Sequence, residues 1–161
     1  MSHFKKIKDP LNKFKKGYQR NNPNLLKHLE SKLINGEPFH YLFLGTVGCG
    51  KTYLARNIMY CSLSKWERVK VHTFDALNSH NRAMQSESLL IDDLGDEKPS
   101  TEAAHDYFGG LIERRYDYLD RKVDISRTII TTNLNGDQID NTYGSRVLDR
   151  LKHRFVICKF N

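Results

Sequence analysis

A glycine-rich run of eight residues begins at Gly45 and is suited to hold a chain of phosphates. It reads Gly45-Thr46-Val47-Gly48-Cys49-Gly50-Lys51-Thr52 and matches the pattern Gly-x-x-x-x-Gly-Lys-Ser/Thr at every fixed position. Glycines leave room for successive backbone N–H groups to approach phosphate oxygens. Lys51 would place its charge on the β and γ phosphates, and Thr52 would offer a hydroxyl to Mg²⁺. An apolar run before the motif and an amphipathic run after it argue against a chance match, so we predict a site for ATP and Mg²⁺.

Two adjacent carboxylates, Asp92 and Asp93, close the apolar run Leu89-Leu90-Ile91. A carboxylate at the end of a strand holds Mg²⁺ in P-loop NTPases, and Asp92 suits that task. Asp93 would polarise the attacking water, and Glu97 on the following loop would share that work. The alternative is that Asp-Asp-Leu-Gly is only a turn, because Asp and Gly favour turns. Its position after a phosphate loop favours the catalytic interpretation.

Polar and basic residues farther along the chain suggest further roles in the same chemistry. Asn133 closes the run 128–132, where its amide would orient the attacking water; the alternative is a strand cap. Arg146 and Arg150 are four residues apart, so a helix would place both on one face. Either would be able to reach the γ phosphate of a neighbouring subunit and stabilise charge in the transition state. The alternative is an ordinary surface helix, and the sequence leaves open which arginine would act.

Strands and helices alternate around these residues. Short apolar or alternating runs predict strands at 39–44, 69–74, 88–91, 128–132 and 155–160. Amphipathic spacing predicts helices at 25–34, 51–63, 101–120 and 144–152. This alternation is typical of a three-layer α/β fold, with a parallel five-stranded sheet flanked by helices.

These motifs, in this order, resemble those of an AAA+ ATPase. The resemblance extends over residues 40–161 and is carried by the runs 43–55, 90–95, 128–134 and 146–151. Within that class the chain is similar to the DnaC and DnaI helicase loaders and to the transposition helper ATPase IstB. The resemblance implies a P-loop NTPase that hydrolyses ATP to ADP and phosphate. It assigns Walker A to Lys51 and Thr52, Walker B to Asp92 and Asp93, sensor 1 to Asn133, and the arginine finger to Arg150 or, second, Arg146.

The resemblance implies a DNA-replication accessory protein, preferably a helicase loader. Such a protein would act with a replicative helicase and single-stranded DNA through ATP-dependent homo-oligomers. One alternative is an IstB-like helper of a transposase, and the small size suits a virus or mobile element. Another is a degenerate AAA+ module that binds ATP with little turnover, since Asp93 stands where the common pattern has Glu. We expect a minimal core at 21–161 without a C-terminal lid domain.

Positive charge is concentrated near the amino terminus of the chain. The 161 residues carry a formal net charge of +7 at pH 7. Residues 1–20 contain seven basic residues and one acidic residue, which leaves a net charge of +1 for the rest. Basic arms often contact nucleic acid, although this arm could instead aid only solubility. The predicted contacts with single-stranded DNA are Lys5, Lys6, Lys8, Lys13, Lys15, Lys16 and Arg20.

Composition limits the compartment in which the protein is expected to work. The three cysteines, Cys49, Cys61 and Cys158, have long spacings that match no disulfide framework. No run approaches 18 apolar residues, and the basic amino terminus lacks the apolar segment of a secretory signal. We therefore expect a cytoplasmic, reduced protein with no membrane association.

Overall fold

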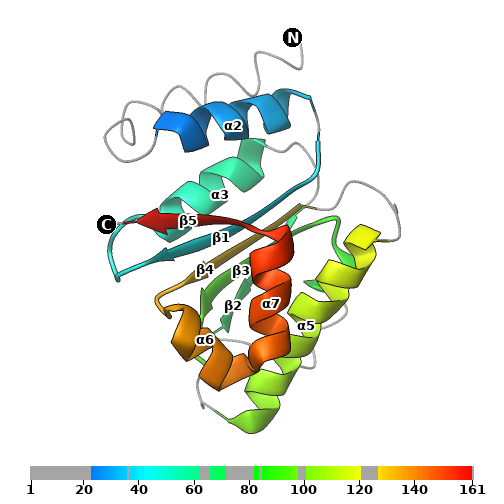
Figure 1. Ribbon diagram of the computed structural model, residues 1–161. Helices are drawn as coiled ribbons and strands as arrows, with labels where there is room; N and C mark the ends of the chain where they lie inside the picture. The colour runs from blue at the N-terminus through cyan, green and yellow to red at the C-terminus, as the bar shows by residue number, and fades with distance from the viewer. Residues whose placement is uncertain are drawn as a thin grey trace.

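A parallel sheet of five strands forms the middle layer of the protein (Figure 1). The computed structural model describes residues 23–35, 37–61, 66–71, 82–83, 85–97, 101–120 and 127–160. The strands are β1 (Phe39–Gly45), β2 (Trp66–Lys70), β3 (Ser88–Leu94), β4 (Arg127–Thr132) and β5 (Val156–Phe160). Their order across the sheet is β2-β3-β4-β1-β5, and all neighbours are parallel. The predicted three-layer α/β fold with a five-stranded parallel sheet is confirmed.

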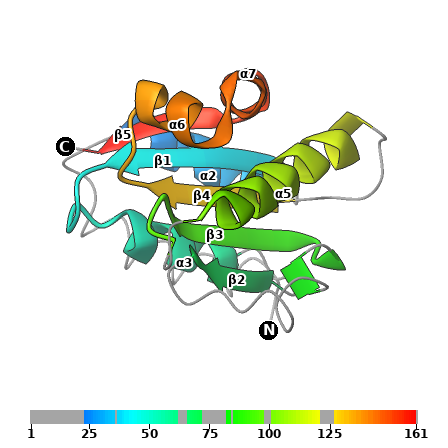
Figure 2. The same cartoon turned by 90° about the horizontal axis from the view of Figure 1, so that it is seen from below.

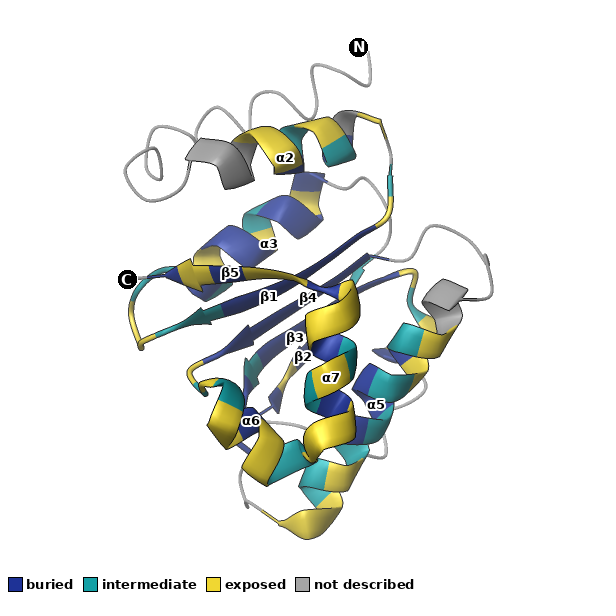
Figure 3. Cartoon of the chain, viewed as in Figure 1, coloured by how far each residue is buried: buried dark blue, intermediate teal, exposed yellow. Residues whose placement is uncertain are grey.

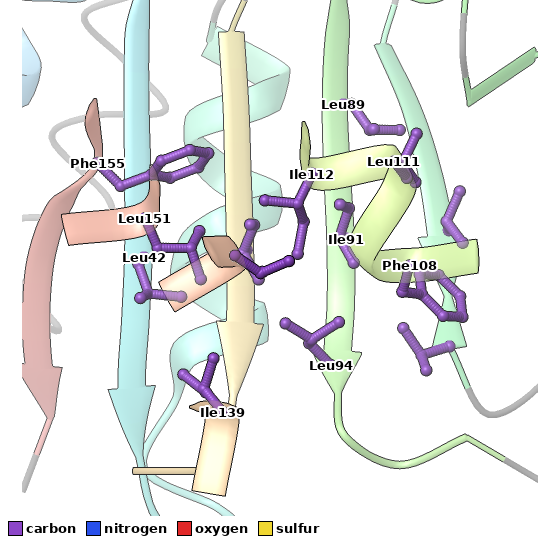
Figure 4. Close-up of a cluster of buried hydrophobic side chains, with 14 of the residues drawn as sticks. Leu42, Leu89, Ile91, Leu94, Phe108, Leu111, Ile112, Ile139, Leu151 and Phe155 are labelled. Carbon is purple, nitrogen blue, oxygen red and sulfur yellow. The ribbon is translucent and has the colours of Figure 1, made fainter. Parts of the chain in front are cut away.

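Helices cover both faces of the sheet (Figures 1 and 2). One face carries α2 (Pro23–Ile34) and α3 (Lys51–Cys61), and the other carries α5 (Glu102–Asp120), α6 (Gly136–Tyr143) and α7 (Ser145–Arg154). Alternate residues of β1 therefore enter two cores: Tyr41 and Phe43 pack toward α3, and Leu42 packs toward α5 and α7. Figure 4 shows the second core, and Figure 3 shows that the inner strands are buried. Burial on both faces explains why these strands are apolar runs in the sequence.

Three elements differ from the sequence-based expectation by more than two residues or were not predicted. β3 continues to Leu94, three residues beyond its predicted end at Ile91, so Asp92 and Asp93 lie within it. The predicted strand 69–74 begins earlier, at Trp66, and its last three residues lie outside the described part of the chain. β2 is an edge strand in which only Val69 is buried, so its sequence contains no apolar run that would predict its start. Helix α6 was not predicted, because Asn135-Gly136 resembles a turn. It begins with a capping box in which the Asn135 side chain and Gln138 bond each other's backbone N–H, a signature that the sequence does contain.

The parallel register brings the carboxyl ends of the strands to one edge of the sheet. Leu44 of β1 and Leu94 of β3 both pair with Thr132 of β4. A β-bulge separates Ile91 from Leu94 in the pairing of β3 with β4. In open α/β sheets, ligands bind outside this edge. The predicted site residues of the phosphate loop, Asp92, Asp93 and Asn133 all lie there.

The three cysteines are free thiols. Burial raises the pKa of Cys61 to about 11 and that of Cys158 to about 12, so both stay protonated near neutral pH. Within the ranges described, none of the helices has the length and apolarity that crossing a membrane requires.

Candidate nucleotide-binding site

The glycine-rich loop links β1 to α3, and its glycines have two distinct tasks. Gly48 and Gly50 adopt φ values of 82° and 91°, which L side chains rarely tolerate. Gly45 lies against the edge strand β5, where an added Cβ would come within 2.6 Å of the Phe160 carbonyl oxygen. Helix α3 begins immediately after the loop, at Lys51, so its unpaired N–H groups and positive dipole end face this edge. The loop therefore combines close backbone approach with a helix amino terminus, as an anion site requires.

The Lys51 ammonium group joins the loop to the end of β4. This side chain is buried, and its Nζ donates hydrogen bonds to the carbonyl oxygens of Gly45 and Thr46, each at 2.7 Å. It donates a third bond, of 2.8 Å, to Oδ1 of Asn133. Lys51 and Asn133 are 82 residues apart in the sequence. Two residues that the sequence assigns to the phosphates and to the attacking water thus meet in the structure.

Asp92 is fully buried and accepts hydrogen bonds from three side chains. Its Oδ1 accepts the hydroxyl of Thr52 at 2.8 Å and the hydroxyl of Thr131 at 2.7 Å. Its Oδ2 accepts Nε of Arg68 at 3.0 Å, and Nη2 of the same guanidinium also donates to it. Sequence analysis singled out Thr52 and Asp92 but missed Thr131 and Arg68. A threonine inside a buried strand was a usable signal for Thr131, whereas nothing local in the sequence points to Arg68.

Asp93 has a left-handed backbone, with φ of 62°, at the β-bulge of β3. Its N–H donates to the Thr131 hydroxyl at 2.9 Å. Successive residues of a regular strand point to opposite faces, but a bulge re-aims a side chain. Asp is among the residues that tolerate this conformation best. The bulge therefore lets the two adjacent carboxylates serve the same edge of the sheet.

A cavity of about 280 Å³ opens at this edge. It is lined by Val47, Gly48, Gly50, Lys51, Thr52, Tyr53, Asp93 and Asn133. The adjacent hydroxyl of Thr52 and carboxylate of Asp92 are the hard oxygen donors that Mg²⁺ prefers, and Mg²⁺ is typically bound through one or two carboxylates plus substrate phosphates. The ammonium of Lys51 and the amino terminus of α3 suit the phosphates themselves. The residues present therefore fit a nucleotide with Mg²⁺.

Comparisons with solved structures identify the fold that carries this site. No known protein family matches the sequence, and no curated protein does either. Among solved structures, the DnaC helicase loader superimposes with a TM-score of 0.68 at 18% identity, over 85% of this chain and 88% of that one. Replication initiator DnaA bound to AMPPCP and single-stranded DNA gives 0.64 at 17% identity, over 88% of this chain and 47% of that one. The Thermotoga maritima RuvB Holliday junction branch migration motor gives 0.53 at 19% identity, over 83% and 41%.

The chain has the fold of an AAA+ ATPase core. The predicted resemblance is confirmed at this level, including the likeness to the DnaC loader. The AAA+ core spans most of the DnaC structure, but less than half of the DnaA and RuvB chains.

Glu97 does not line the cavity. It is buried beside α5 and α6, where the Tyr143 hydroxyl donates to its Oε1 and Nε2 of His105 lies 3.9 Å from its Oε2. Burial, together with the hydrogen bond to Glu97, raises the pKa of Tyr143, so Tyr143 remains a donor. The structure therefore does not bring Glu97 together with Asp93 at the cavity, because its carboxylate faces Tyr143 of α6 and His105 of α5.

The two candidate arginine fingers lie on α7 and contact α5 of the same chain. Nε of Arg146 is 3.2 Å from Glu113, and Nη1 of Arg150 is 3.6 Å from the same carboxylate. Arg150 also approaches Asp117 at 3.7 Å and lies 5.0 Å from the centre of the Tyr116 ring. The Arg146 side chain is 72% exposed and that of Arg150 only 16%. Neither lines the cavity of its own chain.

The predicted DNA contacts in residues 1–20 lie outside the described residues.

Proposed function

We propose that this protein binds and hydrolyses ATP in DNA replication, as a helicase loader that acts with single-stranded DNA. The observation that carries the proposal is the meeting of two pairs at the edge of the sheet where the cavity opens, Lys51 with Asn133 and Thr52 with Asp92, each at 2.8 Å. In P-loop enzymes these residue types bind the phosphates and Mg²⁺ of a nucleoside triphosphate and orient the water that attacks it. The likeness to the DnaC loader over 88% of that chain supports the specific role.

Binding rests on the loop and the first turn of α3. Lys51 pairs with the β and γ phosphates, and the N–H groups of residues 46–51 surround them. Thr52 and Asp92 would hold Mg²⁺, which would supply positive charge to neutralise the phosphate oxygens. Asp92 is already fixed by Thr52 and Thr131, so it keeps its orientation when the ligand enters.

Hydrolysis rests on two side chains that line the cavity, Asp93 and Asn133. Asp93 accepts a hydrogen bond from the attacking water and polarises it. Asn133 orients that water, and through Lys51 it also responds to the γ phosphate, because its Oδ1 accepts from the same ammonium. Catalysis is then mainly a matter of positioning and charge stabilisation, as is usual for phosphoryl transfer.

An arginine of α7 completes the site of a neighbouring subunit in an ATP-dependent homo-oligomer. Arg150 is the first candidate and must leave Glu113 and Asp117 to reach it. Arg146 is the second; its side chain is more exposed but must leave Glu113. Arg150→Ala should reduce turnover without weakening ATP binding, with Arg146→Ala measured beside it. Mixing Arg150→Ala with Lys51→Ala subunits should restore turnover, because each supplies the part that the other lacks. Failure to complement, together with lost ATP binding by Arg150→Ala, would argue against a role in trans.

The basic arm of residues 1–20 is proposed as a contact with single-stranded DNA. Each phosphate contact releases counterions, so binding through the arm weakens as salt rises. Deleting residues 1–20 should lower the affinity for a labelled oligonucleotide and flatten its salt dependence. An unchanged affinity and slope would exclude the arm as the DNA contact.

Co-purification with the host's replicative helicase, with and without ATP, tests the loader role inside the cell. Capture that requires ATP, and that is lost in Lys51→Ala, supports the proposal. Polymerisation on duplex DNA without helicase capture would favour the transposition helper. ATP binding without turnover, even with single-stranded DNA, would favour a degenerate module.

A further inference from the structure

Arg68 neutralises the buried Asp92 from the neighbouring strand β2. The Asp92 side chain is 1% exposed, and a buried carboxylate is costly unless it is paired and hydrogen-bonded. Two hydroxyls bond its Oδ1, whereas two N–H groups of the Arg68 guanidinium bond its Oδ2. Arg68 is therefore the cation among the groups that hold Asp92, and none of the motifs discussed above includes it.

These four hydrogen bonds use the whole accepting capacity of Asp92. A carboxylate offers about four acceptor sites, two on each oxygen. Mg²⁺, or a water that it binds, would therefore have to displace one of these donors to reach Asp92. Thr131 is held in place because its hydroxyl also accepts the Asp93 N–H. Thr52 has to remain, because its hydroxyl is the second oxygen donor of the proposed metal site. Arg68 is the donor that is able to leave.

The surroundings of Arg68 allow that movement. It lies on β2, an edge strand of the sheet, and its side chain is 23% exposed. A flexible guanidinium at this position is able to break its hydrogen bonds to Asp92 and to bond to water instead. Its charge also opposes the approach of a divalent cation to the same carboxylate, since like charges a few ångströms apart repel strongly where water is excluded.

We propose that Arg68 competes with nucleotide-bound Mg²⁺ for Asp92 and so sets the Mg²⁺ concentration at which the site fills. The proposal rests on the proposed ATP-binding function and names a residue that determines metal affinity within it. Two consequences follow. Without metal, Arg68 stabilises the fold by pairing Asp92. With metal and nucleotide, it weakens binding, and by thermodynamic reciprocity the metal loosens the contact between β2 and Asp92.

The test compares the wild-type chain with Arg68→Gln, which removes the charge and shortens the side chain. Lys70→Gln is the matched control, because it removes an equal charge from an exposed residue of the same strand. Binding of a fluorescent ADP analogue is titrated with Mg²⁺ and, separately, measured in EDTA. Arg68→Gln should lower the Mg²⁺ midpoint about fivefold, as a coupling of ordinary size would, and leave the affinity in EDTA unchanged. Lys70→Gln should leave the midpoint near the wild-type value.

Thermal unfolding gives a second measurement that needs no turnover. Arg68→Gln should melt below the wild type in EDTA, and saturating Mg²⁺ and ADP should narrow the difference. If Arg68→Gln does not fold, Arg68→Lys is measured instead. This variant keeps the positive charge but loses the paired N–H donors of the guanidinium, so its Mg²⁺ midpoint should still fall below that of the wild type. A midpoint that is unchanged or higher in the folded variant overturns the competition. A wild-type chain that binds no nucleotide at any Mg²⁺ concentration overturns the proposed function instead.

Discussion

Both ends of the parallel sheet bury charged groups, but they bond them to different kinds of partner. At the carboxyl end, Lys51 bonds two loop carbonyls and Asn133 beside an open cavity. At the amino end, Arg115 of α5 is buried and donates to the carbonyl oxygens of residues 86, 87 and 127 at 2.5–3.2 Å and to the Thr128 hydroxyl at 3.1 Å. A ligand is able to replace the partners of Lys51. The carbonyls that Arg115 satisfies belong to the backbone that leads into β3 and β4, so its role is structural.

His40 adds a second buried group to the amino end. Its ring lies 5.5 Å from that of Phe155, and among the described residues no group hydrogen-bonds either ring nitrogen. Burial, with the charges of Arg115 and Arg154 nearby, lowers the pKa of His40 to about 3. The carboxyl end is therefore arranged to accept a charged ligand, and the amino end to exclude an added proton.

The largest expected effect is on nucleotide binding at the carboxyl end. Lys51→Ala should weaken ATP binding about 100-fold and abolish turnover, because charge-assisted bonds to phosphate are lost. Fluorescent-nucleotide titration measures the affinity, and Lys152→Ala, on the exposed face of α7, is the control. Unchanged affinity and rate in Lys51→Ala would remove the functional difference between the two ends.

A second substitution at the carboxyl end should change only the rate of ATP hydrolysis. Asp93→Asn keeps a residue that tolerates the left-handed backbone but removes the carboxylate charge. The rate of ATP hydrolysis should fall about 100-fold while nucleotide affinity stays near the wild-type value. Phosphate release under saturating ATP measures the rate, and Asp96→Asn on the following loop is the control. A wild-type rate would assign the activation of water to another group.

The amino end should show the reverse pattern, a loss of stability without a loss of binding. Arg115→Met leaves several buried oxygens without donors and should cost about 3 kcal/mol of unfolding free energy. Urea denaturation measures this, with Arg114→Met, an exposed neighbour on α5, as the control. The folded fraction should bind nucleotide with wild-type affinity. If Arg115→Met instead weakens binding but not stability, the two ends do not divide their tasks in this way.

The smallest effect is a pH dependence that arises at His40. Between pH 6.5 and about 3 the unfolded chain binds a proton at this residue and the folded chain does not, so stability falls as pH falls through that range. The slope that His40 contributes is at most about 1.4 kcal/mol per pH unit. His40→Phe should therefore lose less stability than the wild type between pH 6.5 and 5, measured by urea denaturation at each pH. If the stability of both proteins falls equally steeply with pH, His40 takes up a proton in the folded chain as readily as in the unfolded chain, and its pKa is not lowered.

A short apolar run is a local signal, whether the strand is buried on both faces like β1 or lies at an edge like β5. β1, β3, β4 and β5 were predicted within three residues of their observed bounds. β2 was displaced because an edge strand tolerates polar residues, and α6 was missed because its capping box begins with a turn-like Asn-Gly pair.

The sequence by itself determined the phosphate loop, since its eight residues are contiguous and their chemistry does not depend on distant neighbours. It also indicated that Asp92, Asp93 and Asn133 lie near the carboxyl ends of strands. Only the tertiary structure decided what surrounds Asp92. Arg68 and Thr131 are 24 and 39 residues away from it and become its partners only when β2 and β4 pair with β3 on either side. The order of strands in a sheet is set by packing between distant segments, and no local pattern contains it.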